Sequence, residues 1–305
     1  MKKETHPPIK INSISQLHEV LGFEKPVHPL ISLNHNVNMI VDEKLLNQHF
    51  LFNFYKISYK KTLKGKMGYG QGYYDFDEGG MIFTAPHQLL STSKEDMEYE
   101  GLTLLIHADF FRNYHLATKI KTFGFFDYSA NEALYLSEKE KQTIFSVFEN
   151  IQEELNNNID DFSQDVLISH IEVLLNYSNR FYKRQFITRK AVNSDLLTQL
   201  EQHLNQYFTQ EMGLQKGLPT VEFLASLLNV SPRYFSDMLR ALTGQNAQQH
   251  IHEKLIEKAK EYLTTTQLSV SEIAYQLGFE HPQSFNKLFK KKTDTTPLEF
   301  RTSFN

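Results

Sequence analysis

The sequence predicts an α+β protein with more than one domain, on three observations. Its 305 residues allow two or three domains, and its composition, 40% hydrophobic and 22% charged, is ordinary for a globular protein. Between about residues 31 and 106, short apolar and aromatic runs alternate with turn residues, which is typical of β-strands. From Ser137 onward, apolar residues recur at helical spacing. We therefore expect a β-rich N-terminal domain followed by helical segments.

The expected strands include the runs HFLFNFYKISY, GMIFTAP and GLTLLIH. A hairpin is expected within GYYDFDEGGMIFTAP, where residues 77–80 supply the turn. Many short strands favour a barrel or a sandwich. Aromatic and hydrogen-bonding side chains on such strands are candidates for binding a small ligand, although each could instead fill the core or face solvent. These candidates are His35, His49, Tyr55, Tyr59, Tyr69, Tyr74 and His87.

Two helices are expected after the strands. Ser137 and Glu140 form a capping box before the first, and the second should run from about Ser163 to Lys183. Their apolar stripes could pack on the strands or on their copies in a second subunit. Residues 186–193 are polar and basic, which predicts a linker.

A helix-turn-helix pattern follows at about residues 221–243. Apolar residues recur at helical spacing from Val221 to Leu228, Asn229 marks a turn, and Ser231-Pro232 begins a second helix. Ala225 is small where two such helices would cross. The shared core should consist of Leu224, Leu228, Val230, Phe235 and Met238.

The pattern repeats at about residues 270–292. Ala274 and Gly278 occupy positions 49 residues after Ala225 and Asn229, and a capping box at Ser269 marks the start. Compared with the spacing from Ala225 to Phe235 in the first motif, one extra residue separates Ala274 from Phe285. We therefore expect a longer turn in the second motif.

One amphipathic helix, residues 247–263, is expected between the two motifs. At about 1.5 Å per residue it would span roughly 25 Å. A rigid spacer of that length could place two recognition helices about one duplex turn, roughly 34 Å, apart on one face of DNA. A capping box at Thr296 and Glu299 predicts a short closing helix.

The run TVEFLASLLNVSPRYFSDMLRALTGQNAQQHI, with LSVSEIAYQLGFEHPQSFNKLFKKKTDTTPLEFR after it, resembles the DNA-binding domain of the AraC/XylS family of bacterial transcription regulators. This resemblance covers about a third of the chain. It implies a domain, residues 194–305, that binds double-stranded promoter DNA through two recognition helices. By position in the motif, base contacts are expected from Arg233, Ser236, Asp237, Arg240, Gln283, Ser284, Asn286 and Lys287.

The chemistry of these side chains agrees with that role. Arginine pairs bidentately with guanine, and glutamine or asparagine pairs with adenine. Asp237 could accept a hydrogen bond from cytosine, orient Arg233, or be a solvated charge. Contacts to phosphate are expected from Tyr234, His281, Lys290, Lys291 and Lys292.

The stretches DFDEGGMIFTAPHQ and GLTLLIHADFF resemble the small cupin-type barrel that precedes this domain in many members of the family. The resemblance implies a cupin-like sensor barrel over residues 1–136 and a helical dimerisation or packing segment over residues 137–185. Metal-binding cupins supply a His-x-His pair with a glutamate. That set does not occur in the N-terminal sequence, and His250 and His252 lie on the expected spacer helix, where residues two apart diverge. We expect neither a metal nor another cofactor.

Cysteine content, the N-terminal residues and net charge bear on where the protein is located and how it could bind DNA. Cysteine is absent, which excludes disulfides, thiolate metal sites and the cysteine-based repair activity of some relatives. The first residues lack the apolar run of a secretion signal, and no apolar stretch is long enough to span a membrane, so we expect a cytoplasmic protein. Because the net charge is −4, we expect attraction to DNA to come from the local positive field around the basic residues of the two motifs.

The resulting hypothesis is a non-enzymatic, sequence-specific transcription regulator that senses a small molecule or dimerises through its barrel. Candidate partners are promoter DNA, RNA polymerase, an unidentified small-molecule effector and a second copy of the chain. Two alternatives remain: a cupin-type metal enzyme tethered to DNA, and a non-specific architectural DNA binder.

Overall fold

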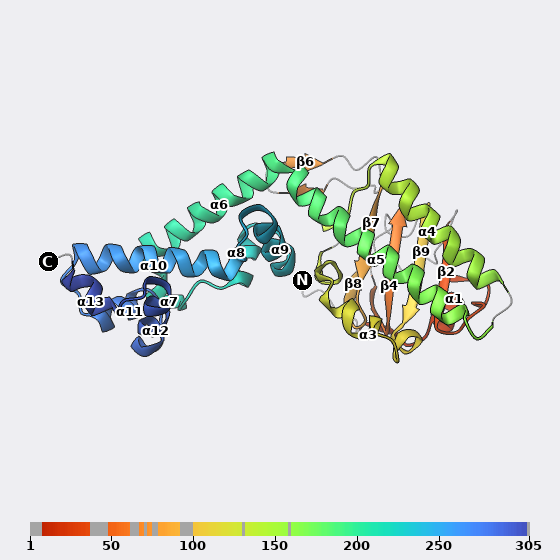
Figure 1. The fold of residues 1–305 in the computed structure, drawn as a ribbon, viewed down its shortest axis with the longest axis horizontal. Coiled ribbons are helices and arrows are strands. Elements are labelled where there is room, and N and C mark those ends of the chain that lie inside the picture. The colour runs from red at the N-terminus through yellow and green to blue at the C-terminus, as the bar shows by residue number, and fades with distance from the viewer. Residues whose placement is uncertain are drawn as a thin grey trace, which may run out of the picture. The chain divides into compact units, whose positions relative to one another are not determined.

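The computed structural model describes residues 8–36, 48–61, 67–69, 72–74, 79–91, 100–129, 132–157 and 160–303. The chain divides into two compact units, residues 1–185 and 186–305 (Figure 1). The first contains all the described strands, and the second is helical.

An antiparallel four-stranded sheet is the centre of the first unit. Its order is β2 (Ile31–Asn36), β9 (Gly101–His107), β4 (Phe54–Lys60) and β7 (Gly80–Thr84). In β9, Leu102, Leu104 and Ile106 on one face and Thr103 and Leu105 on the other are all buried. A strand can be apolar at nearly every position only when both of its faces are covered. This accounts for the central position of β9, between β2 and β4.

Two smaller sheets complete the described strands. The first contains β1 (Ile9–Ile11), β3 (His49–Phe52) and β8 (Leu89–Ser91), and the second pairs β5 (Met67–Tyr69) with β6 (Gly72–Tyr74). Backbone pairing does not join the described sheets to one another. A barrel requires pairing all the way round. Among the described residues the expected cupin-like barrel is therefore not closed.

The expected hairpin is wrong in its pairing. Part of its turn, residues 77 and 78, lies outside the described residues. The two strands that it was to join have other partners: β6 pairs with β5, and β7 pairs with β4 in a register that places Gly80 opposite Lys60. Met81 and Phe83 are buried in β7. The apolar side chains of β7 are thus buried where this strand pairs with β4. This is a long-range pairing that the local turn residues could not predict.

Short helical segments surround the sheets. Sequence patterns did not predict them, because each has too few residues for a clear period. They are α1 (Ile14–Leu21), η2 (Ala108–Phe111), α3 (Leu116–Lys119), η3 (Ile120–Thr122) and η4 (Gly124–Asp127).

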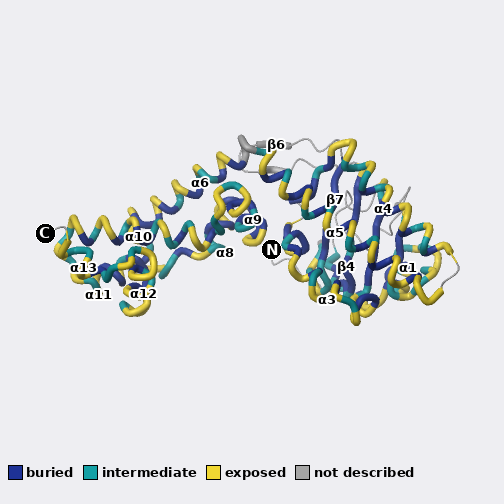
Figure 2. Tube along the Cα trace, in the orientation of Figure 1, coloured by how far each residue is buried: buried dark blue, intermediate teal, exposed yellow. Residues whose placement is uncertain are grey.

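Two long helices, α4 (Glu138–Asn156) and α5 (Ser163–Thr188), cross one face of the four-stranded sheet in Figure 1. The capping box of Ser137 and Glu140 starts α4 as expected. Figure 2 shows buried positions recurring along both helices. The predicted apolar stripes are buried within the unit, including Ile144, Ile151 and Leu174. Internal packing therefore occupies the faces that could also have served dimerisation.

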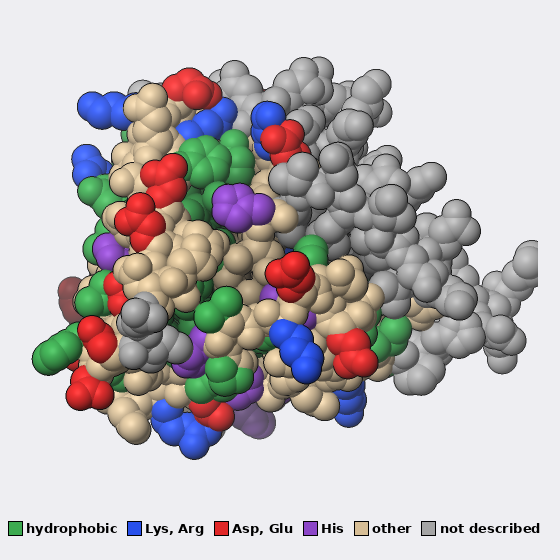
Figure 3. Space-filling view, turned by 90° about the vertical axis from the view of Figure 1, so that its right-hand side faces the viewer, with side chains coloured by type: hydrophobic (Ala, Val, Ile, Leu, Met, Phe, Trp, Pro, Cys, Tyr) green, Lys and Arg blue, Asp and Glu red, His purple; other side chains and the backbone are tan. Residues whose placement is uncertain are grey.

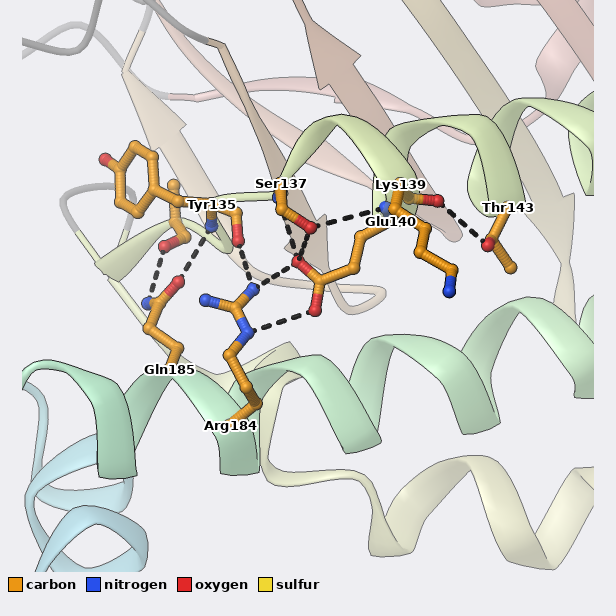
Figure 4. Close-up of polar contacts among 8 residues, drawn as sticks. Tyr135, Ser137, Lys139, Glu140, Thr143, Arg184 and Gln185 are labelled. Atoms are coloured by element: carbon orange, nitrogen blue, oxygen red, sulfur yellow. Dashed lines mark hydrogen bonds and ion pairs between the residues drawn. The ribbon is translucent and has the colours of Figure 1, made fainter.

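A polar cluster holds the end of α5 against the start of α4 (Figure 4). Arg184 donates through Nε to Glu140 at 3.0 Å and through Nη2 to the same carboxylate at 2.6 Å. Arg184 Nη2 also donates to the carbonyl oxygen of Tyr135 at 2.7 Å. Next to it, the Gln185 amide accepts from the backbone N–H of Tyr135 at 2.8 Å and donates to the carbonyl oxygen of Ala133 at 3.1 Å.

The predicted linker, residues 186–193, is mostly helical. Its first residues complete α5, and its last ones begin α6 (Lys190–Thr209). Phe186 and Asn193 are buried, and the Asn193 amide donates to the carbonyl oxygen of Phe186. Burial of these two side chains stabilises a helical backbone that a polar, basic sequence did not suggest. A short helix, α7 (Met212–Lys216), follows α6.

Among the described residues, no helix has the length and apolar character needed to cross a membrane.

Candidate nucleic-acid interface

The first helix-turn-helix consists of α8 (Val221–Leu227) and α9 (Pro232–Thr243). Asn229, in the turn, has a φ of 54°, the left-handed conformation that asparagine tolerates better than most residues. Ser231 caps α9 by accepting the backbone N–H of Tyr234 at 3.3 Å. The predicted core is confirmed: Leu224, Ala225, Leu228, Val230, Phe235 and Met238 are all buried.

The second motif consists of α11 (Val270–Gln276) and α12 (Pro282–Thr293). Its turn has five residues against four in the first motif, as the spacing predicted. Gly278 has a φ of 97°, and a Cβ placed there would lie 2.3 Å from the carbonyl oxygen of Gly217. Only glycine avoids both the strain and the clash. The second turn is thereby packed directly against the segment that follows α7.

One continuous helix, α10 (Ala247–Thr265), joins the motifs. Asn246 and Gln249 form its capping box, and its 19 residues span about 28 Å. Figure 1 shows α8 and α9 near one end of α10 and α11 and α12 near the other. The predicted closing helix is also present as α13 (Pro297–Thr302), with its capping box at Thr296 and Glu299.

The first recognition helix, α9, presents two exposed arginines held by one carboxylate. Asp237 accepts from Arg233 Nε at 3.1 Å and from Arg240 Nη1 at 3.4 Å. The Asp237 side chain is 19% exposed, whereas Arg233 is 46% and Arg240 55% exposed. Ser236 is half-buried, and its hydroxyl accepts the backbone N–H of Ala247 at 3.4 Å. The arginines are therefore the outermost groups of this set.

Tyr234 does not fit the expected phosphate contact. It is only 2% exposed, and its ring packs edge-on against Phe186 at 5.2 Å. Its position on α9 faces the core of the second unit, so the structure gives it a packing role.

The second recognition helix, α12, presents every predicted side chain to solvent. Exposed positions are Gln283, Ser284, Asn286, Lys287, Lys290, Lys291 and Lys292, together with the preceding His281. The apolar residues Phe285 and Phe289 are buried on the opposite side. No acidic residue occurs in the sequence of α12, whereas α9 contains Asp237. The two recognition helices therefore differ in charge, with α12 the more basic.

The structure places the candidate ligand residues of the first unit in different settings. His35 is exposed at the end of β2, and His87 is exposed with a φ of 64°. Tyr55 is buried between Phe111 and Phe126, with ring centroids 5.7 and 5.1 Å away. Burial, with Asp127 nearby, raises the pKa of Tyr55. Its phenol is therefore a core group, and the expected ligand contact is not supported.

Two other candidates, Tyr69 and Tyr74, lie in β5 and β6, but their side chains fall outside the described residues. A cavity beside β2 and β4 does contain His35 and Tyr59 in its lining.

Histidine and acidic side chains do not form a metal site in the described part of the chain, where no group of three or more is suitably placed. On α10, His250 bonds to Thr243 through Nε2 at 2.9 Å and His252 bonds to Gln248 at 2.9 Å, so each ring has its own partner.

Two helix-turn-helix motifs at the ends of one helix define the second unit as a DNA-binding domain. A family model described as a helix-turn-helix domain matches residues 224–303. The chain is 29% identical over 142 residues to an uncharacterised helix-turn-helix transcriptional regulator, YfiF, of Bacillus subtilis, covering 47% of this chain and 42% of that protein. It is 27% identical over 140 residues to the transcriptional activator RhaS of Klebsiella pneumoniae, covering 46% of this chain and 45% of that protein. The second unit therefore contains a helix-turn-helix domain of the AraC type.

Among solved structures, the C-terminal domain of the two-component response regulator yesN from Fusobacterium nucleatum is 31% identical. The match covers 35% of this chain and 98% of that one, with a TM-score of 0.31. The chain spans about half the length of the curated relatives that it matches, and both of those alignments cover less than half of this chain.

Proposed function

We propose that this protein is a sequence-specific DNA-binding regulator of transcription. The observation that carries the proposal is the pair of recognition helices, α9 and α12, with exposed polar and basic side chains at both ends of the unbroken helix α10. A helix-turn-helix places such a helix in the major groove.

Base recognition is assigned to both helices. Arg233 and Arg240 have the donor geometry that pairs with guanine, and Gln283 and Asn286 can pair bidentately with adenine. Ser236, Asp237, Ser284 and Lys287 are assigned to the same faces. His281, Lys290, Lys291 and Lys292 are assigned to phosphate, because exposed cations at the end of a recognition helix neutralise the backbone without reading sequence.

Spacing gives the proposal a quantitative test. A spacer of about 28 Å is comparable with one duplex turn of roughly 34 Å, so both helices can enter successive major grooves. Selection of bound sequences from a random DNA library should yield two short motifs with centres about 10 base pairs apart. A single motif, or motifs half a turn apart, would contradict simultaneous reading by α9 and α12.

The same selection separates this function from an architectural role. An architectural binder reads the backbone and the deformability of DNA, so its affinity should differ little between selected and competitor sequences. We propose no enzymatic role. Metal bound to the purified protein, or turnover of a substrate, would favour the alternative of a tethered cupin enzyme.

A homodimer is proposed as the functional state. On α5, Val166 and Val173 are 37% and 39% exposed, and their spacing of seven residues places them on one helix face. Phe162, in the turn just before α5, is 70% exposed. Exposed apolar residues in such a row are typical of a helix packed against a partner. The full chain should sediment as a dimer, and Val173→Asp should shift it toward the monomer. A monomeric wild-type chain at the concentration used for DNA binding would contradict the proposal.

The first unit is proposed to sense a small molecule, with RNA polymerase as the candidate protein partner at the promoter. Both assignments depend on the DNA-binding role, because only binding at a promoter would connect them to transcription.

A further inference from the structure

A cavity of about 750 Å³ lies in the first unit between the four-stranded sheet and α4. The sheet contributes Leu33, Tyr59 and Leu102 to its lining, and α4 contributes Phe145 and Phe148. The rings of Tyr59 and Phe145 meet edge to face, with centroids 4.8 Å apart. Its volume falls within the range of small-molecule sites, roughly 300–1,000 Å³. The cavity therefore has room and apolar surface for a compact organic molecule.

Charged side chains also line this cavity. Two lysines and four glutamates contribute to the lining, which leaves a formal excess of two negative charges. Each lysine already has a carboxylate partner: Lys61 Nζ lies 2.9 Å from Glu100, and Lys141 Nζ lies 2.6 Å from Glu138. The face of the molecule in Figure 3 shows hydrophobic side chains beside both acidic and basic ones.

The remaining two carboxylates are Glu149 and Glu153. They are exposed and stand four residues apart on α4, which places them on one helix face. Since both lysines are paired, the field at this part of the lining is negative. A ligand that brings its own cation is favoured there, and an anionic ligand is repelled.

We propose that this cavity binds an amphipathic amine, a molecule with an apolar body and a protonated amino group. The body packs on Leu33, Leu102 and Phe148, and the ammonium group donates to Glu149 and Glu153. Burial raises the pKa of the Tyr59 phenol, so this group stays uncharged and can orient the ligand as a neutral hydrogen-bonding partner.

This site also adjoins the polar cluster at the end of α5. Glu138 and Lys141, which line the cavity, flank Glu140 in the first turn of α4, and Glu140 is the partner of Arg184. A ligand that moves this turn therefore acts on the residues that hold α5, the helix that leads into the second unit. This regulatory consequence rests on the proposed function, whereas binding of the amine does not.

The test uses the full chain and two matched probes, 2-phenylethylamine and 3-phenylpropionate, measured by isothermal titration calorimetry. Both carry the same apolar body, but their charges are opposite. We expect the amine to bind at least about ten-fold more tightly than the carboxylate, since like charges disfavour binding by such factors. The double substitution Glu149→Gln/Glu153→Gln should reduce affinity for the amine by about ten-fold. Glu154→Gln on the same helix, whose side chain lines a different pocket, should leave it unchanged.

Equal affinity for the two probes, no measurable binding of the amine, or full affinity in the double variant would each overturn the proposal. Thermal denaturation checks that the double variant is folded. If it is not, the single substitutions carry the same test, each with a loss of at least about three-fold expected from removing one charge. DNA binding is measured separately in the absence of amine, so failure of the regulatory function and failure of the amine site are distinguishable.

Discussion

Arg233 and Asp237 form an ion pair on the exposed face of the first recognition helix, with Arg233 Nε 3.1 Å from Asp237 Oδ2. Arg240 approaches the other carboxylate oxygen at 3.4 Å, so one acid holds two arginines. Exposed pairs of this kind contribute only about 0–1 kcal/mol to stability. The pairs therefore cost little to open, and we expect Asp237 to position the two guanidinium groups rather than to lock them.

Asp237→Asn should bind non-specific DNA more tightly, because it removes a negative charge from a face turned to a polyanion. Affinity for the selected site should rise less, since the arginines lose their fixed orientation, and the ratio of specific to non-specific affinity should fall. Competition binding at two salt concentrations measures this ratio. Glu257→Gln is a matched control, because Glu257 also pairs with a cation but lies on α10. An unchanged ratio would show that Asp237 has no positioning role.

Substitutions of the base-contacting residues and of the phosphate-contacting residues should have different effects on DNA binding. Arg233→Ala and Gln283→Ala should each relax preference at one base position, with a loss of about 1–3 kcal/mol at the preferred base. Lys291→Ala should weaken all sequences alike and reduce the salt slope by about 0.9. Binding-site selection with each variant, and titration against salt, distinguish these effects. If Arg233→Ala selected the wild-type sequence, α9 would not read the groove through that residue.

Gly278→Ala should destabilise the second unit by more than about 2 kcal/mol, because the new Cβ would meet a backbone oxygen in a left-handed backbone conformation. Gly244→Ala provides the comparison. Its φ is also positive, at 79°, but a Cβ at this position would have no atom within 4 Å, so only backbone strain of about 1 kcal/mol is expected. Chemical denaturation of both variants measures the difference. Equal losses of stability in the two variants would mean that the clash with the Gly217 carbonyl oxygen contributes nothing.

Arg184→Ala should lower the free energy of unfolding of the first unit by about 1–3 kcal/mol, because it leaves the Glu140 carboxylate, 15% exposed, without its cation. Lys61→Ala breaks a pair whose side chains are 61% and 58% exposed, and it should change stability by less than about 1 kcal/mol. Urea denaturation of the two variants provides the comparison, and similar effects would contradict a special role for the cluster in Figure 4.

Acid should weaken the caps of the second unit. Hydrogen bonds from the backbone of Ser269 and Thr296 hold the pKa values of Glu272 and Glu299 below their ordinary value of 4.5. A lowered pKa in the folded state adds stability that is fully present above the ordinary pKa and is lost as the pH falls through the lower, folded pKa. Melting temperature should therefore fall in this acidic range, and Glu272→Gln with Glu299→Gln should reduce that fall. The same decline in the double variant would assign it to other carboxylates.

Local signals in the sequence were sufficient for the helical domain. The capping boxes expected at Ser269 and Thr296 are present in the structure, as is the one at Ser137 in the first unit, and Asn229 and Gly278 both lie in the turns where they were expected, with positive φ. Each signal depends on residues within four positions of one another, so it can be read without knowing the fold.

Long-range packing decided what the sequence could not. Of two neighbouring residues on α9, Tyr234 is buried in the core and Arg233 is exposed at the surface. The burial of Tyr234, whose ring packs against Phe186, depends on a residue far away in the sequence. Strand partners also depend on distant residues, which is why the expected hairpin was wrong and why β7 lies beside β4.

By itself, the sequence determined that this protein has two helix-turn-helix motifs and which side chains their recognition helices carry, because helices form through contacts between near neighbours. Only the tertiary structure decided that Asp237 holds two arginines, that Tyr55 is a core residue, and that Tyr59, Phe145 and Glu149 line one cavity. Such groupings depend on how side chains pack in three dimensions, and residues far apart in sequence meet only once the sheet and α4 have packed together.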